Sequence, residues 1–539
     1  MTELGKELNK VDILFVGAGP ASLASAIKLK QLLKEKGQEA SVVVIEKADK
    51  LGQHNLSGAV FEAEVLDELV PGWKESKHGF ISTMLANRVE KDEVLYLTSG
   101  GYFRLPPSLV PRDLHHVGNY SISVSAMVKW LADIARGLGI EIYTGFAAKE
   151  LVIEDNIVKG VRLGEKGLDK EEHKMPNYVP GDIIEAKVTI LGEGSLGLLA
   201  EQLAQKFGLD KGRNHQIHSL GVKEIIKLPE GNKFGSKRVI HTLGFPNKSD
   251  VFGGGTLYSM GENMVAVALI TALDWKYCDL NPQQELQIFK SHKFVSDLIE
   301  GGEVVAYGAK TLPEGGYFSL PKLVANGAMM IGDAAGFTNV KKLKGLHYAI
   351  KSGLLAAEAI FDALQKASFS AQDFQKYERL LEASFIIKDL RAARNYRQVF
   401  NFPGGIYTGL PLSFIQQLFF KLKTIPDYKG MRRTRLNRTF KGAIDRLTDV
   451  SFSGTIHRED EPSHITFVNP DKCEPCEARF GCHPCEYFCP GEVYRFEDHE
   501  LVLSPSNCLH CQTCRVKCPE QNIKWEVPEG GDGPRYKLM

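Results

Sequence analysis

Cysteine is almost absent from the first 472 residues of the chain, which hold only Cys278 of the ten. A net charge is absent too, because Lys plus Arg and Asp plus Glu both number 66, so no overall positive field attracts nucleic acid. The N-terminus, MTELGKELNK, lacks the apolar core of a signal peptide and is too acidic for a typical transit peptide. The 539 residues, 43% of them hydrophobic, predict a soluble globular protein of about three or four domains that does not bind nucleic acid.

The first motif is a dinucleotide-binding pattern near the N-terminus. The apolar run 11–16 predicts a buried strand, Gly17-Ala18-Gly19-Pro20 a turn into a helix, and the run 42–45 a second strand that ends at Glu46. Glycines at such a turn let phosphates approach the backbone amides of the helix start, and the acidic residue accepts hydrogen bonds from a ribose. The third glycine of the usual motif is Ser22 here, and a glycine turn without a ligand is the alternative interpretation.

A second motif of the same class follows far along the chain. The run 328–331 predicts a strand that ends at Gly332-Asp333, and the apolar spacing from Gly345 to Ala363 predicts a long helix. This pattern resembles the second FAD motif of glutathione-reductase-like and hydroxylase-like flavoproteins, in which the aspartate binds the ribityl chain. An aspartate that only caps a helix is the alternative, but two such motifs in one chain predict an α/β FAD-binding fold.

The stretch between the two motifs is expected to be a substrate domain. It contains strand-like runs at 219–226 and 264–270, with Gly253-Gly254-Gly255 between them. Three adjacent glycines indicate a bulge or a close backbone approach, and a flexible hairpin tip is an equally good interpretation.

Residues 398–420 carry no charge, yet they do not predict a membrane span, because prolines, glycines and amide side chains interrupt them. The residues that follow, 421–446, are rich in Lys and Arg, and the loop 103–111 is also apolar. This combination predicts peripheral attachment to an anionic membrane surface, with an internal helix and a solvated basic loop as the alternative. From Leu412 the spacing predicts an amphipathic helix with its apolar face made of Phe414, Ile415, Leu418, Phe419 and Leu422.

The other nine cysteines follow residue 472 and are spaced as in ferredoxins. The run Cys508-x2-Cys511-x2-Cys514-x3-Cys518-Pro519 matches the bacterial pattern for a [4Fe–4S] cluster, and Cys489-Pro490 ends a stretched copy of it. In ferredoxins with two clusters, the cysteine before proline binds the cluster of the other run. That rule assigns a first cluster to Cys489, Cys508, Cys511 and Cys514.

A second cluster would combine Cys518 with three of the four upstream cysteines. We predict Cys476, Cys482, Cys485 and Cys518 for it, which leaves Cys473 spare. A zinc site or free thiols are the alternatives for these residues. Paired zinc knuckles fit the tail poorly, because the pattern is three cysteines and a Cys-Pro rather than two separated Cys-x-x-Cys pairs.

The whole chain resembles the electron-transfer flavoprotein:ubiquinone oxidoreductase family, in a bacterial type with a ferredoxin-like C-terminal domain. Besides the motifs above, the resemblance is carried by GQHNLSGAV (52–60), FGGGTLY (252–258), AYGAKTLPEGGYFSLPKL (306–323), GFTNVKKLKGLHYAIKSGLLAAEAIF (336–361), SGTIHREDEPSH (453–464) and VPEGGDGPRYKLM (527–539).

This resemblance implies an enzyme that takes single electrons from reduced electron-transfer flavoprotein, passes them between the cluster and FAD, and delivers pairs to a membrane quinone. It implies a quinone head group at Gly253 and Gly254, a single cluster on Cys489, Cys508, Cys511 and Cys514, and no catalytic acid or base. The implied location is the cytoplasmic face of the inner membrane, or the matrix face of the inner mitochondrial membrane in a eukaryote. The residues it implies for FAD are Gly17, Gly19, Pro20, Glu46, Lys47, His54, Ser57, Gly58, Gly332, Asp333 and Asn339.

The expected fold class is therefore α/β and α+β. We expect a Rossmann-like FAD-binding body in two parts, 1–210 and 326–450, a quinone-binding domain at 211–325, and a ferredoxin-like domain at 451–539, with a membrane-facing segment at about 403–423. Two other functions stay open. An electron-carrying subunit of an electron-bifurcating complex that reduces menaquinone would share these motifs, whereas a flavin-dependent isoprenoid-lipid reductase would not need the cysteine-rich tail.

Overall fold

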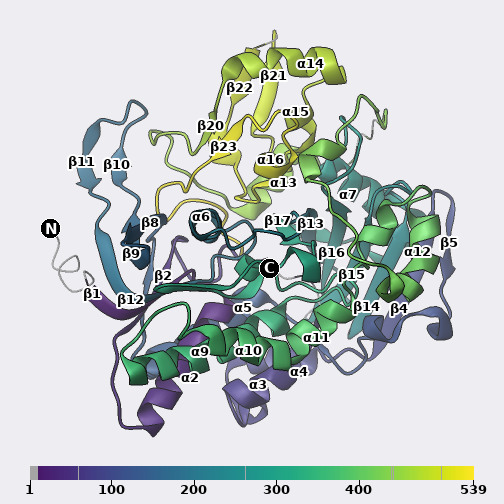
Figure 1. Cartoon of the computed structure of the whole chain (residues 1–539). Coiled ribbons are helices and arrows are strands. Elements are labelled where there is room, and N and C mark those ends of the chain that lie inside the picture. Colours follow the sequence, from purple (N-terminus) through teal and green to yellow (C-terminus); the bar gives the residue numbers. More distant parts are fainter. Residues whose placement is uncertain are drawn as a thin grey trace.

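Two large β-sheets with their helices, and a smaller C-terminal unit drawn in yellow at the top of Figure 1, make up the computed structural model of this protein. The structure describes residues 10–539 except Ser57, Ala59, Glu262, Thr439, Lys441, Ala443 and His499. Ser57, one of the residues expected to bind FAD, therefore lies outside the described residues.

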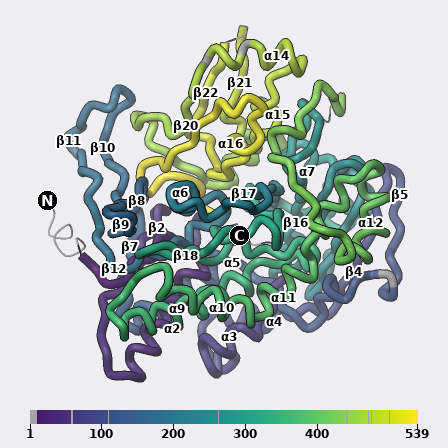
Figure 2. Tube along the Cα trace, viewed as in Figure 1, coloured from purple at the N-terminus to yellow at the C-terminus, as the bar shows by residue number. Residues whose placement is uncertain are grey.

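The first sheet is the expected dinucleotide-binding sheet, with eight strands. Its central strands pair in parallel in the order β19-β12-β1-β2-β7, which buries an apolar run such as Leu14 and Phe15 completely. Helix α2 packs against α9, and Figure 2 shows the purple and green tubes side by side although they lie far apart in sequence. The strands are β1 (Lys10–Val16), β2 (Val42–Glu46), β7 (Glu141–Thr144), β8 (Ala148–Glu154), β9 (Ile157–Leu163), β12 (Ile183–Leu191), β18 (Val324–Ala325) and β19 (Ala328–Met330).

The helices of this part pack around that sheet and share its hydrophobic core. The helices are α2 (Pro20–Glu35), α3 (Glu64–Leu69), α4 (Gly79–Ala86), α5 (Val124–Gly137), α6 (Leu198–Phe207), α9 (Leu346–Lys366), α10 (Gln375–Ala383) and α11 (Phe385–Ala392). The short antiparallel pairs are β3 (Val60–Phe61) with β6 (Tyr120–Ser121), and β10 (Lys166–Leu168) with β11 (Lys174–Val179).

The second sheet has seven strands in the order β17-β13-β16-β15-β14-β4-β5. Residues 91–104, which we expected in the FAD-binding part, instead form its last two strands, because β4 pairs in parallel with β14. The elements are β4 (Lys91–Thr98), β5 (Gly101–Arg104), β13 (His218–Lys227), β14 (Arg238–Gly244), β15 (Gly253–Gly261), β16 (Met264–Ala272), β17 (Glu303–Pro313), α7 (Pro282–Ser291) and α8 (Lys293–Leu298).

The three adjacent glycines are the first residues of β15 and not a hairpin tip. A Cβ on Gly253 would lie 2.0 Å from the carbonyl oxygen of Ile270 on β16, and one on Gly254 would lie 2.2 Å from that of Thr242 on β14. Close backbone approach of the two neighbouring strands is therefore the reason for glycine here.

The predicted amphipathic helix from Leu412 onward is wrong in its extent. Helix α12 (Ile406–Ile415) contains Pro411 and ends at Ile415, and a 3₁₀ turn and extended chain follow. The buried side-chain amide of Asn395 donates to the carbonyl oxygens of Gln416, Phe419 and Phe420, at 3.0–3.2 Å. These carbonyls are therefore not available for the backbone hydrogen bonds that a longer helix would form. Phe419 and Leu422 are partly buried, whereas Phe420 is exposed.

The C-terminal unit has the ferredoxin-like arrangement of two helix-linked strand pairs, β20 with β23 and β21 with β22. Its core is continuous with that of the second sheet. Its last residues return to the first part of the chain, where Gly531 N donates to Lys47 O (2.8 Å) and Ser125 N donates to Met539 O (2.9 Å). The elements are α13 (Arg446–Ser453), β20 (Ile465–Phe467), α14 (Glu474–Phe480), α15 (Pro484–Phe488), β21 (Tyr494–Glu497), β22 (Glu500–Leu503), α16 (Thr513–Lys517) and β23 (Ile523–Trp525).

Candidate functional site

A cavity of about 740 Å³ runs between the two sheets and beneath the C-terminal unit. Most of the residues expected to bind FAD line it, and so do both glycines expected at the quinone. The residues that the structure brings together are Gly17, Gly19, Pro20, Glu46, Lys47, His54, Gly58, Gly253, Gly254, Gly332 and Asp333.

Asn339 is the exception, because it is buried beside the cavity and does not line it. Its side-chain oxygen accepts from Lys341 N and Lys342 N, both at 3.1 Å, and its backbone pairs with that of Lys344. Asn339 therefore shapes the loop that precedes α9, in which its neighbours Thr338 and Val340 line the cavity, and its expected contact with the cofactor stays a prediction.

The polar end of the cavity lies where β1 and β2 end. Helix α2 begins here with Gly19 as its N-cap, without a side-chain cap, so that its first amides face the cavity. The carboxylate of Glu46 is held in place by the backbone amides of Ala18 and Ala48, both at 2.9 Å. Gly17 has φ of +92°, and a Cβ there would lie 2.7 Å from Gly192 O at the end of β12. This end fits the phosphates and ribose of a dinucleotide.

Two buried lysines and an aspartate set the charge of this end. Burial, together with the positive charge of Lys310 on β17, lowers the pKa of Lys47 to about 8. Burial raises the pKa of Asp333 to about 6, although Lys310 opposes that shift. Among the described residues, neither lysine ammonium has a hydrogen-bond or ion-pair partner, so the site fits an anionic ligand.

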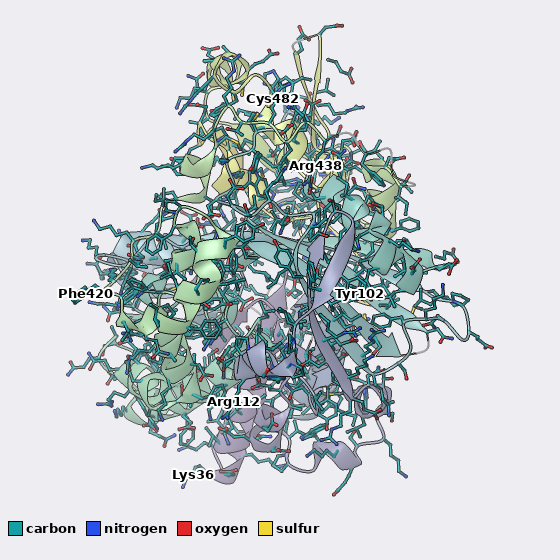
Figure 3. All side chains as sticks on the ribbon, turned by 90° about the vertical axis from the view of Figure 1, so that its right-hand side faces the viewer. Lys36, Tyr102, Arg112, Phe420, Arg438 and Cys482 are labelled. Atoms are coloured by element: carbon teal, nitrogen blue, oxygen red, sulfur yellow. The ribbon has the colours of Figure 1, made fainter. Side chains whose placement is uncertain are left out.

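The other end of the cavity is apolar and reaches the surface at α12. Phe252, Phe400 and Leu410 line it, together with Phe414, whose side chain is 69% exposed. A residue that both lines the cavity and meets solvent marks an opening. Figure 3 faces the side of the molecule on which α12 and β5 lie, and Phe420 and Tyr102 are labelled there. This end fits a lipophilic ring compound that enters from outside.

Four thiols lie beside the polar end. Burial raises the pKa of Cys514, and the charges of Cys508, Cys511 and Cys489 also raise it. Because these charges act on Cys514, the four thiols lie near one another. Among the described residues, no three cysteine sulfurs lie within 4.8 Å of one another. Tetrahedral zinc would hold them at about 3.8 Å, since Zn–S is about 2.3 Å. The donor set therefore fits an iron–sulfur cluster better than a zinc ion.

The cysteine loop borders the cavity directly. Gln512, next to Cys511, lines the cavity, as does Trp525 on β23. The charges of Cys511, Glu46 and Asp333 all raise the pKa of Lys310 against its burial, so Lys310 lies between the two cofactor sites. A group bound by the four thiols would therefore lie next to the dinucleotide-binding end of the cavity, where an electron could pass between the two.

Some of these residues were missed in the sequence. Lys310 is a single lysine in an apolar strand, and its neighbours come from distant segments. His510 is also missed, although it lies between two cysteine ligands. It belongs to a buried imidazole cluster, in which His457 Nε2 and His510 Nε2 are 2.9 Å apart, and burial lowers the pKa of His464 to about 3.

The predicted ligand set for a second cluster needs a correction. Cys482 lies beside Cys278, with its sulfur 3.5 Å from the Cys278 carbonyl oxygen. Cys473, which we had left spare, lies instead with Cys476, Cys485 and Cys518 around a small separate cavity.

Comparison with known proteins identifies the family. A model described as "Electron transfer flavoprotein-ubiquinone oxidoreductase, 4Fe-4S" matches residues 441–537, and one described as "ETF-QO, ubiquinone-binding" matches residues 218–312. The electron transfer flavoprotein-ubiquinone oxidoreductase of Pseudomonas aeruginosa is 38% identical over 99% of this chain and 100% of its own. The chain belongs to the electron transfer flavoprotein-ubiquinone oxidoreductase family.

Plant members of the family, both named as mitochondrial, are similarly related. The Oryza sativa protein is 39% identical over 99% of this chain and 94% of its own, and the Arabidopsis thaliana protein 40% over 100% and 86%. Family membership confirms the expected resemblance and the expected set of FAD, [4Fe–4S] cluster and quinone.

Solved structures confirm the fold class of this family member. A geranylgeranyl bacteriochlorophyll reductase-like protein of Thermoplasma acidophilum matches with a TM-score of 0.57 at 18% identity, over 78% of this chain and 94% of its own. A flavin-dependent brominase matches with a TM-score of 0.50 at 16% identity, over 76% and 93%. At such identities the likeness shows the fold alone.

Proposed function

We propose that this chain accepts single electrons from reduced electron transfer flavoprotein and delivers them in pairs to a membrane quinone. The observation that carries the proposal is the single cavity, which joins a dinucleotide-binding end beside the cysteine loop to an apolar end that opens at the surface. The names of the relatives support the same activity. FAD supplies a group that accepts electrons one at a time and releases two.

Residues of this chain hold and tune the cofactor sites. Glu46, fixed by two backbone amides, binds the ribose, and Asp333 at the start of the loop before α9 orients the ribityl chain. Lys47 and Lys310 place positive charge beside both the diphosphate and the reduced cofactor, and so offset negative charge there. Electron transfer itself needs no acid or base from the chain, and the two protons that convert the quinone to quinol are taken up from solvent.

The function is tested by anaerobic mixing of the purified protein with reduced electron transfer flavoprotein and a short-chain ubiquinone. We expect the flavin to bleach and quinol to form, and we expect NADH and NADPH to leave the flavin oxidised. Bleaching by a nicotinamide nucleotide without any response to electron transfer flavoprotein would contradict the proposal and favour the lipid-reductase alternative.

The FAD placement makes a separate prediction. Asp333→Ala and Glu46→Ala each remove a charged hydrogen-bond partner, worth about 1.5–3 kcal/mol, so each should weaken FAD binding about 10- to 100-fold. Equilibrium dialysis or fluorescence titration of FAD measures this. Glu165→Gln, on the exposed β10 side of the molecule, is the control and should bind FAD as the wild type does. Unchanged affinity in both test variants would refute the placement.

We further propose peripheral attachment to the inner membrane, at its cytoplasmic face or, in a eukaryote, its matrix face. Apolar side chains surround the cavity opening on two elements, and Tyr96 on β4 contacts Tyr407 on α12 through their hydroxyls at 3.3 Å. No helix among the described residues is both long and apolar enough to cross a bilayer. The exposed set, which we term the apolar rim, consists of Tyr102, Phe103, Tyr407, Phe414, Leu418 and Phe420.

The rim suits a shallow contact with lipid because basic side chains follow it directly. Leu418 is 80% and Phe420 94% exposed, and the exposed Lys421 and Lys423 come next in the chain. Apolar residues buried at the headgroup level combine with lysines attracted to anionic lipids. A quinone could then pass from the bilayer into the cavity without crossing water.

Membrane attachment is tested with Leu418→Glu combined with Phe420→Glu, because neither residue lines the cavity. The double variant should lose about 2–3 kcal/mol of binding to anionic vesicles in a flotation assay. Its turnover with a short-chain quinone in detergent should stay at the wild-type rate. Val179→Glu is the control and should still float, because β11 lies at the left of Figure 1 and α12 at the right. Undiminished flotation of the double variant would rule out the rim as the contact surface.

A further inference from the structure

Four thiols outside the first cluster site gather around a small cavity of their own. Cys473 and Cys476 lie at the start of α14, Cys485 lies in α15, and Cys518 follows α16. All four cysteines line this one cavity, so they surround the same space. This cavity shares none of its lining residues with the 740 Å³ cavity.

A buried amide donates to two of these sulfurs. Asn522, 1% exposed, donates its backbone N–H to Cys518 Sγ at 3.4 Å and its side-chain NH₂ to Cys473 Sγ at 3.3 Å. Its side chain is itself fixed, since it also exchanges hydrogen bonds with the backbone of Asn469, at 2.7 and 2.8 Å. N–H groups aimed at sulfur stabilise thiolates, and hydrogen bonds of this kind tune bound iron–sulfur groups.

The two groups of four cysteines are built in the same way. Cys485 on α15 is followed by Cys489-Pro490, and Cys514 on α16 by Cys518-Pro519, while α15 and α16 pack against each other. In each case, one helical turn carries a cysteine of one group at its start and a cysteine of the other group at its end. The two cysteines are about 6 Å apart along the helix axis. This is the exchange of ligands between two sites that a ferredoxin with two clusters requires.

Other roles for these thiols fit less well. All ten cysteines are free, and among the described residues no three sulfurs lie within 4.8 Å of one another, whereas a single zinc ion would hold them about 3.8 Å apart. Cys482 is excluded from the group because Gly481, with φ of +76°, ends α14 and directs Cys482 toward Cys278 and Arg435. Cys473 occupies the place that the sequence spacing had given to Cys482.

We propose that Cys473, Cys476, Cys485 and Cys518 bind a second [4Fe–4S] cluster, separate from the cluster on Cys489, Cys508, Cys511 and Cys514. Each cluster accepts and releases one electron, so the second adds a one-electron site whose lining residues are all different from those of the flavin cavity. The binding of this cluster does not depend on which protein donates the electrons.

The test is iron, inorganic sulfide and zinc analysis of the full-length protein, purified anaerobically. We expect about eight iron and eight sulfide per FAD in the wild type. Cys473→Ser and Cys518→Ser should each retain about four iron, and the electron paramagnetic resonance spectrum of the reduced protein should change from two interacting clusters to one. Full FAD content in each variant shows that it has folded.

Two cysteines provide matched controls. Cys482→Ser and Cys278→Ser should keep about eight iron, because both thiols lie outside the proposed group. About four iron in the wild type with no change in Cys473→Ser would overturn the proposal, and so would one equivalent of zinc that Cys473→Ser removes. Loss of half the iron in Cys482→Ser, with Cys473→Ser unaffected, would overturn the ligand set.

Discussion

A protein that carries Cys514→Ser is expected to keep its FAD and to lose reduction of quinone by reduced electron transfer flavoprotein by more than about 100-fold. Loss of a residue that only supports a ligand already costs about 10- to 100-fold, and Cys514 is itself expected to be a ligand. Cys514 is buried, as are Cys489, Cys508 and Cys511, so the group that they bind is shielded from solvent. Stopped-flow absorbance with both substrates measures the loss.

The control for this prediction separates electron entry from electron exit. When the flavin is reduced chemically, Cys514→Ser should still pass electrons to a short-chain quinone at close to the wild-type rate, because the quinone end of the cavity is unchanged. Cys278→Ser, a buried thiol outside both groups, should behave as the wild type in both assays. Normal turnover of Cys514→Ser with electron transfer flavoprotein would show that electrons reach the flavin by another path.

Arg397→Met is expected to lower the free energy of unfolding by about 3–5 kcal/mol, as for other buried ion pairs that lose one partner. Arg397 is 2% exposed, and its guanidinium donates to Glu314 Oε2 at 3.1 Å and to Asp274 Oδ1 at 2.7 Å. The substitution would leave both carboxylates without their cation. Urea denaturation of the FAD-bound protein, followed by fluorescence, measures the change.

The pH dependence of this effect has a definite sign. Burial already raises the pKa of Glu314, and Arg397 is the main group that opposes the shift. In Arg397→Met, the pKa of Glu314 in the folded state rises further above its value in the unfolded state. The free energy of unfolding therefore falls as the pH increases between these two pKa values. The deficit relative to the wild type should therefore be smaller at pH 5 than at pH 8. Arg391→Met, which breaks an exposed pair with Glu382, should cost less than about 1 kcal/mol at either pH.

Local patterns in the sequence predicted much of the fold and many of the residues that line the cavity. The strand–turn–helix units around Gly17 and Gly332 could be predicted because short-range apolar spacing and glycine turns determine them. Cys489 and Cys518 could be placed in opposite groups because the Cys-Pro rule depends on chain direction alone. These features need no knowledge of distant contacts.

The parts that could not be predicted depend on contacts between distant segments. Spacing alone does not decide between Cys473 and Cys482, because that choice rests on where α14 ends and on Cys278 in another part of the chain. The apolar period beyond Ile415 continues, but Asn395 binds the carbonyls that a helix would use. Lys310 is recognisable as a site residue only from its neighbours, which are Glu46, Asp333 and Cys511 from three distant segments of the chain.

The return of the C-terminal segment to the first sheet has a consequence for how the protein is made. Lys47 and Gln53, which border the flavin site, receive hydrogen bonds from Gly531 and Tyr536, across more than 480 residues of chain. Contacts of such separation form late in folding, because a long loop must close before they stabilise anything. During synthesis the dinucleotide-binding strands leave the ribosome long before the segment that closes over them. The flavin site is therefore completed only once the segment around Gly531 and Tyr536 has been synthesised and has packed against it.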